Sequence, residues 1–222
     1  MQGSDIGFAP IKIDSGDDIY VISGVSGQLL KVDKNLKPLA DICTPFPALI
    51  TSSTILGNIW IGVWIERDLR QARMAALDLT DDWSNGPTKS DLRDYQSGFS
   101  LHPSSNVWSQ ILDSEPTALS QVDGSICFST INRGIYKIDG ESNEIWRAEI
   151  PKWSEIEKIN TFDEIVAFLS YEEQLVLMSK AGGFAIIDEN GNLVQKGGLK
   201  LPEVITGFQY EKELGWFIKL NG

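Results

Sequence analysis

The residue types that most often carry catalysis are scarce in this chain. It has one histidine, His102, in the loop-like run Phe-Ser-Leu-His-Pro-Ser, and two cysteines, Cys43 and Cys127. A Cys/His catalytic pair needs a thiolate, and Cys127 stands in an apolar run, where burial disfavours that form. Whether the two cysteines form a disulfide stays open. Because no second histidine stands at metal-ligand spacing, the sequence predicts no catalytic residue and no metal site.

The segment Asp188–Asn192 resembles the start of a calcium-binding loop. Such loops need glycine at the sixth position and glutamate at the twelfth. This chain has Leu193 and Leu199 there, so the segment is better interpreted as a turn between two strands. The chain has no Gly-x-Ser-x-Gly elbow, phosphate loop or dinucleotide fingerprint either. The sequence therefore predicts no bound cofactor.

Arginine and tryptophan are enriched at binding hot spots, and they cluster around one long insertion. Residues 83–114 form a predicted inserted loop rich in Ser, Asn, Gly and Pro, and long loops in compact domains are usually functional or disordered. A predicted hairpin over Glu66–Arg70 lies beside it and carries two arginines. The alternative interpretation is that the loop tryptophans only pack the loop onto the sheet. The candidate binding residues are Arg67, Arg70, Trp83, Trp108, Arg133 and Trp153.

A repeated sequence element indicates the fold in which these residues lie. An apolar stretch ending in aspartate, followed by a short turn and a second apolar stretch, occurs at Asp33, Asp78, Asp139 and Asp188, with spacings of 45, 61 and 49 residues. Two of these spacings are close to the period of propeller blades, and the third is longer by about one surface loop. The aspartate has a mechanical role, because its carboxylate can accept backbone N–H groups within a tight turn.

Two further elements precede each aspartate. The nearer is an apolar run rich in β-branched and aromatic residues, as in Asn58–Trp64 and Ser125–Thr130. Glycine separates this run from the aspartate strand in three copies, which is the punctuation of a tight hairpin. The farther element is led by proline, as at Pro10 and Pro116, and proline suits the first residue of a strand.

Together these elements predict an all-β fold of four-stranded antiparallel modules, with strands A to D in chain order. In such a module, the B–C turn and the D–A connection emerge at the same end. We expect a single domain over 1–222, with about four to five blades and an inserted loop over 83–114. The blades are predicted at 8–43, 46–82, 115–150 and 155–199, with a partial blade, an A–B pair, at 202–222.

The pattern Tyr136-Lys-Ile-Asp139, a short turn, then Glu144-Ile-Trp-Arg147 resembles the repeat of the PQQ-like and WD40-like β-propellers. The resemblance is strongest over Ser125–Arg147 and Leu175–Val194, and looser over Asp18–Leu39. It implies the propeller fold, which hosts many unrelated functions. A resemblance to PQQ enzymes would imply a quinone on a tryptophan floor with a calcium ion, but this chain lacks the vicinal cysteine pair that the resemblance would also imply.

Charge and hydropathy limit the classes of partner that this chain can have. The formal net charge of −12 argues against a nucleic-acid ligand, because such proteins need Lys and Arg to replace counterions. No apolar run is long enough for a membrane span. The N-terminus lacks the basic and apolar regions of a signal peptide, so cytoplasmic residence is the expectation.

The leading hypothesis is a non-enzymatic protein-binding or assembly module that uses the B–C/D–A loop face of blades two and three. Two alternatives stay open: an enzyme with a site in the central channel, either a quinoprotein or a sugar-active hydrolase, and an acidic inhibitor or immunity-type protein. The last predicted strand, Leu214–Leu220, would expose an unpaired edge. We expect this edge to be covered by residues 1–10, by a second copy in a homo-oligomer, or by a missing chain segment that completes the blade.

Overall fold

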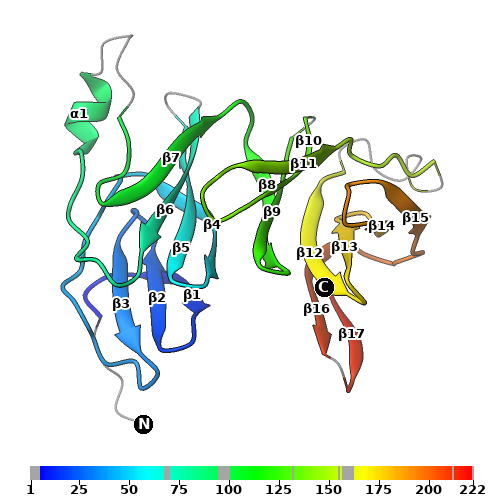
Figure 1. Ribbon diagram of the computed structural model, residues 1–222, viewed down its shortest axis with the longest axis horizontal. Helices are drawn as coiled ribbons and strands as arrows, with labels where there is room; N and C mark the ends of the chain where they lie inside the picture. Colours follow the sequence, from blue (N-terminus) through cyan, green and yellow to red (C-terminus); the bar gives the residue numbers. More distant parts are fainter. Residues whose placement is uncertain are drawn as a thin grey trace. The chain divides into compact units, whose positions relative to one another are not determined.

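The computed structural model describes residues 6–67, 71–94, 101–131, 133–154, 156, 163–211 and 213–221. The chain divides into two compact units, residues 1–113 and 114–222 (Figure 1). The structure is nearly all β, as predicted, with five antiparallel sheets. The prediction of a single domain over 1–222 stays a prediction, and the two units are described in turn.

The first unit contains a three-stranded sheet, in the order β1-β2-β3, and a four-stranded sheet, in the order β4-β5-β6-β7. Consecutive strands pair antiparallel in both sheets. The elements are β1 (Pro10–Ser15), β2 (Ile19–Gly24), β3 (Leu29–Asp33), β4 (Leu49–Leu56), β5 (Ile59–Glu66), β6 (Gln71–Asp78), the short helix α1 (Lys89–Arg93) and β7 (Asn106–Leu112).

The second unit contains two four-stranded sheets and one two-stranded sheet, again with consecutive strands as neighbours. No helix in the described residues is long and apolar enough to cross a membrane. The strands are β8 (Pro116–Val122), β9 (Ser125–Thr130), β10 (Gly134–Ile138), β11 (Glu144–Ala148), β12 (Ile165–Tyr171), β13 (Gln174–Ser179), β14 (Gly183–Ile187), β15 (Leu193–Gly198), β16 (Ile205–Glu211) and β17 (Gly215–Leu220).

The apolar runs of the sequence form the second strand of each sheet. Strands β5, β9 and β13 are buried along almost their whole length, whereas the outer strands β11 and β15 are largely exposed. A strand that is covered on both faces needs a continuous apolar run instead of an alternating pattern. The pattern therefore identified the inner strands correctly. Proline stands at the first residue of β1 and of β8, as predicted.

In the first unit, the structure differs from the sequence expectation at the fourth strand of both predicted blades. Residues 36–42, where the fourth strand of blade one was expected, form a single isolated bridge, between Pro38 and Val32, because Leu36 has a φ of 61° and Pro38 has no N–H for a ladder. In blade two the fourth strand is β7, which lies inside the segment expected as a loop. Ser and Gln interrupt the apolar residues of β7, so the strand shows no apolar run in the sequence.

The four repeated aspartates hold their turns as expected. The Oδ1 atom of Asp139 accepts the backbone N–H groups of Glu141 and Asn143 at 2.9 and 2.8 Å, and Asp33 and Asp188 make the same pair of bonds in their own turns. Asp78 accepts both the N–H and the hydroxyl of Thr80. These hydrogen bonds favour the charged carboxylate and hold the pKa of all four groups below the usual value.

The lowered pKa values predict a specific pH dependence. A carboxyl group whose pKa falls on folding stabilises the folded state above its unfolded pKa of about 4, and this contribution is lost as the pH falls through the folded pKa. In a double variant, Asp139→Asn with Asp188→Asn, we expect the melting temperature to fall less between neutral pH and pH ~3 than in the parent chain. Differential scanning calorimetry across this range measures the effect. Glu141→Gln with Glu189→Gln removes two charges from the same turns and is expected to keep the parental slope, and a parental slope in both variants would contradict the prediction.

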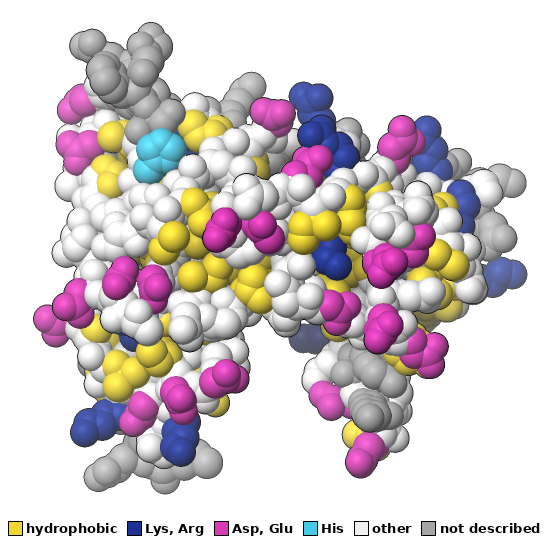
Figure 2. All heavy atoms as spheres, in the orientation of Figure 1, with side chains coloured by type: hydrophobic (Ala, Val, Ile, Leu, Met, Phe, Trp, Pro, Cys, Tyr) yellow, Lys and Arg dark blue, Asp and Glu magenta, His cyan; other side chains and the backbone are white. Residues whose placement is uncertain are grey.

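Acidic side chains dominate the charge of the molecule. Figure 2 shows Asp and Glu side chains scattered over the face drawn, singly and in small groups, in both units. The net charge of −12 follows from 31 acidic and 19 basic residues. A place where Lys and Arg gather without matching carboxylates is therefore notable in this chain.

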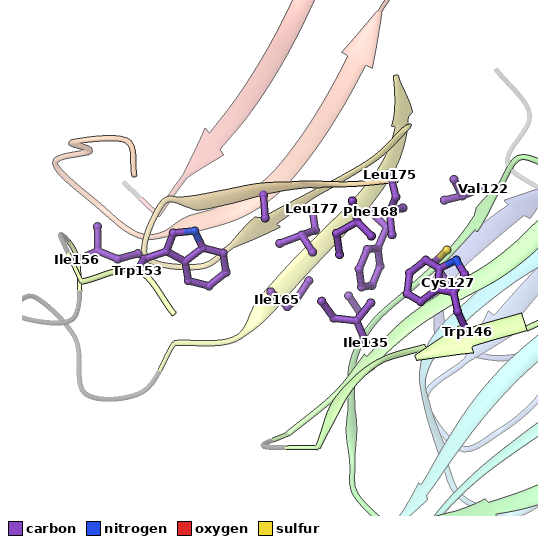
Figure 3. Close-up of a cluster of buried hydrophobic side chains, with 13 residues drawn as sticks. Val122, Cys127, Ile135, Trp146, Trp153, Ile156, Ile165, Phe168, Leu175 and Leu177 are labelled. Atoms are coloured by element: carbon purple, nitrogen blue, oxygen red, sulfur yellow. The ribbon is translucent and has the colours of Figure 1, made fainter. Parts of the chain in front are cut away.

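Each unit has its own apolar core. In the second unit, Ile135, Ile165 and Phe168 converge between the β8–β11 and β12–β15 sheets (Figure 3). Cys127 belongs to this cluster and Cys43 to the first-unit core, and both thiols are free. Burial raises the pKa of Cys43 to about 11 and that of Cys127 to about 12. Both cysteines therefore act as small apolar side chains.

A polar contact joins the two sheets of the first unit. The indole Nε1 of Trp60 on β5 donates to Oδ2 of Asp14 on β1 at 2.7 Å, and Lys12 forms an ion pair with the same carboxylate at 2.7 Å. Trp60 is 0% exposed and packs edge-on against Trp64 with ring centroids 5.5 Å apart. The buried carboxylate is thus satisfied on both sides, as buried charges must be.

Candidate functional site

A hollow of about 370 Å³ lies in the first unit, at the end where the B–C turns and the D–A connection emerge. Four segments line it: the β2–β3 turn, the residues that lead into β4, the end of β5, and helix α1. Antiparallel pairing brings the end of β5 beside the start of β4, where Leu49 pairs with Ile65, and the β2–β3 turn of the other sheet packs against the residues that lead into β4. The lining residues are Val25, Ser26, Pro47, Ala48, Leu49, Ile65, Glu66, Arg67, Lys89, Leu92 and Arg93.

Close backbone packing sets one wall of the hollow. Gly27 in the β2–β3 turn has a φ of +86°, a conformation that favours glycine. A Cβ atom there would lie 2.3 Å from the carbonyl oxygen of Phe46 and 2.7 Å from that of Ala48. The turn that carries Val25 and Ser26 therefore rests directly on the segment that leads into β4.

The insertion supplies the opposite wall and is pinned near both of its ends. The backbone N–H of Gly86 donates to the carbonyl of Thr44 at 3.0 Å, and that of Ser104 donates to the carbonyl of Pro45 at 3.0 Å. A Cβ on Gly86 would lie 1.9 Å from the Pro45 oxygen, so only glycine fits this approach. Both ends of the insertion are thus held against the same segment, which leads into β4.

Helix α1 begins where the chain leaves this clamp. The hydroxyl of Thr88 accepts the N–H of Asp91, and the Asp91 carboxylate accepts the N–H of Thr88, which is a complete capping box. Leu92 on the inner side of the helix is buried in the first-unit core. The cap and this apolar anchor place Lys89 and Arg93 beside the hollow. The spacing Thr-x-x-Asp at 88–91 is the sequence signal for this helix, which was expected as part of a loop.

The floor and rim of the hollow differ in chemistry. Pro47, Ala48, Ile65 and Leu92 are buried and apolar, whereas the rim cations Arg67, Lys89 and Arg93 are exposed. None of these three cations forms an ion pair with another residue in the described parts of the chain. Among the described lining residues, Glu66 is the only carboxylate. The hollow therefore combines an apolar base with a net positive rim, on a chain whose net charge is strongly negative.

The first-unit residues predicted from sequence occupy different environments. Arg67 lies on the rim, while Arg70 lies outside the described residues. Trp83 is half-buried: its Nε1 donates to the carbonyl of Asp78 at 2.6 Å, and its ring packs 6.1 Å from that of Trp60. Trp108 is half-buried on β7, where it pairs with Ala76 on β6. Both tryptophans thus hold the insertion against the sheet.

The second unit has a hollow of about 400 Å³ at the corresponding end of its sheets. Arg133, in the B–C turn of β9 and β10, lines it and is exposed. Three carboxylates also line it: Glu149, Asp163 and Glu164. Their presence makes this hollow chemically unlike the first.

Trp153, also predicted as a binding residue, packs inside the second unit. It is 7% exposed, and its Nε1 donates to the carbonyl of Phe184 at 2.8 Å. A Cβ on Gly183 would lie 2.5 Å from the indole ring, so the ring lies flat on the β14 backbone. The structure therefore gives Trp153 a packing role and leaves no face of its ring for a partner.

Groups that could react are kept apart or buried. His102 bonds through Nδ1 to the hydroxyl of Ser109 at 2.9 Å on the surface, and the two cysteine thiols are buried with raised pKa values. Within the described ranges, no group of three or more His, Cys, Asp or Glu residues is arranged to hold a metal ion. The apolar floor and cationic rim of the first-unit hollow suit an apolar group flanked by negative charge.

The five antiparallel sheets define the class of protein: the fold is that of a β-propeller, incomplete as it stands here. Solved propellers show the same fold at low sequence identity. The β-propeller domain of Myceliophteria thermophila Cps50 (Swd1) matches with a TM-score of 0.65 and 11% identity, over 96% of this chain and 62% of that one. A streptogramin B lyase matches with a TM-score of 0.60 and 13% identity, over 95% of this chain and 61% of that one.

A third similar structure is that of BBS1N in complex with ARL6DN, with a TM-score of 0.57 and 10% identity over 90% of this chain and 57% of that one. This chain thus spans about three fifths of the length of these propellers. No protein-family model matches the sequence, and no curated protein matches it. The structural similarity establishes the propeller fold, but it does not show a relation to the PQQ-like propellers.

Proposed function

We propose that this chain is a non-enzymatic protein-binding or assembly module. Its contact surface would be formed by the B–C turns and D–A connections, those of blade two in the first unit and those of blade three in the second. The observation that carries the proposal is the first-unit hollow at this end of the sheets, which has an apolar floor and three rim cations that form no ion pair within the described ranges. Apolar centres with arginine at their margin are typical of binding hot spots.

The similar structures support the same class of function. The BBS1 domain was solved in complex with another protein, ARL6, and so illustrates a propeller domain that holds a protein partner. A propeller scaffold suits this task because its rigid strands carry variable loops, and binding residues are concentrated on loops. The second-unit hollow around Arg133 would supply further contacts from blade three.

The proposal is tested by partner capture. The variant Arg67→Ala, Arg70→Ala, Arg133→Ala is compared with the parent chain as bait in extracts of the source cells. Each captured protein is then purified, and its affinity for each bait is measured. We expect the variant to bind at least about tenfold more weakly, with an unchanged melting temperature, because hot-spot truncation costs about 2 kcal/mol or more.

The control variant replaces Lys34 and Lys37, in the turn that follows β3, by alanine. These exposed lysines lie at the opposite end of the strands. We expect this control to bind its partner as the parent chain does. Equal affinity of all three baits for every captured protein would overturn the proposed contact surface.

A further inference from the structure

The rim of the first-unit hollow selects for charge as well as shape. Arg67 comes from the end of β5, while Lys89 and Arg93 come from helix α1, and all three are exposed. One carboxylate, Glu66, lines the same hollow, so the described lining residues carry three positive charges and one negative charge. Elsewhere the chain has an excess of carboxylates, so this local reversal of sign would attract a negatively charged ligand.

The floor narrows the class of ligand further. Ile65 and Leu92 are almost fully buried, and Val25, which is 47% exposed, borders the hollow from the β2–β3 turn. A free phosphate or another small anion would use the rim cations but would leave this apolar surface in contact with water. Burial of an apolar side chain against this surface would favour a complex, because it removes apolar area from water. A ligand that uses both features carries an apolar group between carboxylates.

We infer that this hollow binds an acidic peptide segment of a partner protein, with one apolar side chain on the floor and flanking Asp or Glu residues on the rim. The inference rests on the proposed function and names the chemistry of the partner. Lys89 and Arg93, together with Arg67, would contact the carboxylates, and Val25 would contact the apolar side chain. Helix α1 is then the element that gives the surface its specificity, because it contributes two of the three cations.

A random peptide library displayed on phage tests this inference with the full chain as target. We expect the enriched peptides to carry an apolar residue flanked by Asp and Glu. The variant Lys89→Glu, Arg93→Glu is expected to bind synthetic versions of these peptides at least about tenfold more weakly, and added salt is expected to weaken binding to the parent chain. Fluorescence anisotropy measures both effects.

Two further variants separate charge from folding. Lys34→Glu with Lys37→Glu makes the same change in net charge at the opposite end of the strands, and it is expected to keep parental affinity. Val25→Ser leaves every charge in place and is expected to weaken binding several-fold, because it removes apolar contact from an exposed position. Thermal unfolding confirms that all variants are folded.

Several results would overturn the inference, and they differ from failure of the proposed function. Enriched peptides that are neutral or basic, or that ignore the α1 variant while losing affinity for the Arg67, Arg70, Arg133 variant, would refute the acidic ligand and leave the protein-binding module in place. Binding of phosphatidylserine vesicles that the α1 variant abolishes, with no peptide enriched, would assign the rim to a membrane surface instead. No enriched peptide and no captured protein would refute both proposals.

Discussion

Replacement of Trp60 by alanine is expected to lower the free energy of unfolding of the first unit by about 3–5 kcal/mol, the range for aromatic truncation in a packed core. Trp60 is fully buried, and its ring contacts those of Trp64 and Trp83. The variant would also leave the buried Asp14 carboxylate without its indole donor. Urea denaturation followed by far-UV circular dichroism measures the loss.

A second variant divides this effect into packing and hydrogen bonding. Trp60→Phe keeps an aromatic ring at the junction of the two sheets but removes the Nε1 donor to Asp14. We expect it to cost about 1–3 kcal/mol, the penalty for leaving a buried polar group without one partner. A loss below about 1 kcal/mol for Trp60→Ala would show that the two sheets do not depend on this contact.

The isolated chain is expected to self-associate through strand β17. In the other four sheets the second strand is largely buried, but in β17 Trp216 and Phe217 are 40% and 48% exposed. Among the described residues, β17 pairs in its sheet only with β16, so no described strand lies along its other edge. Such edges pair readily with another chain. Light scattering over a range of protein concentrations measures the association.

A single charge should block this pairing. We expect Phe217→Lys to shift the chain towards monomer at concentrations where the parent chain associates, because lysine on an edge strand opposes the approach of a second edge. Val107→Lys, on the exposed outer strand β7, is the matched control and should associate like the parent chain. A parent chain that is monomeric at every concentration would contradict the prediction.

Residues 1–10 are one of the expected covers of β17. Phe8 and Ile6 pack against a buried cluster in the first sheet that contains Ile22 and Leu30. Residues 1–5 lie outside the described ranges. Of the expected covers of β17, a second copy of the chain is the one that light scattering would detect.

The sequence by itself determined the class of fold and most of its strands. Continuous apolar runs such as Ser125–Thr130, turn aspartates such as Asp139, and glycine between the strands are local signals, and each acts through backbone geometry within a few residues. The structure confirms these strands and turns. Their repetition along the chain was sufficient to predict a propeller-like array of antiparallel sheets.

Only the tertiary structure decided where the insertion lies and what it does. The clamp of Gly86 against Pro45 joins segments about forty residues apart, and no local pattern reports such an approach. Through this clamp and the buried Leu92, helix α1 brings Lys89 and Arg93 to the hollow that Arg67 borders. In the second unit, long-range packing against the β14 backbone buries Trp153, which was predicted as a contact residue. Residue type indicates what a side chain can bind, but only packing between distant segments decides which side chains remain at the surface and meet there.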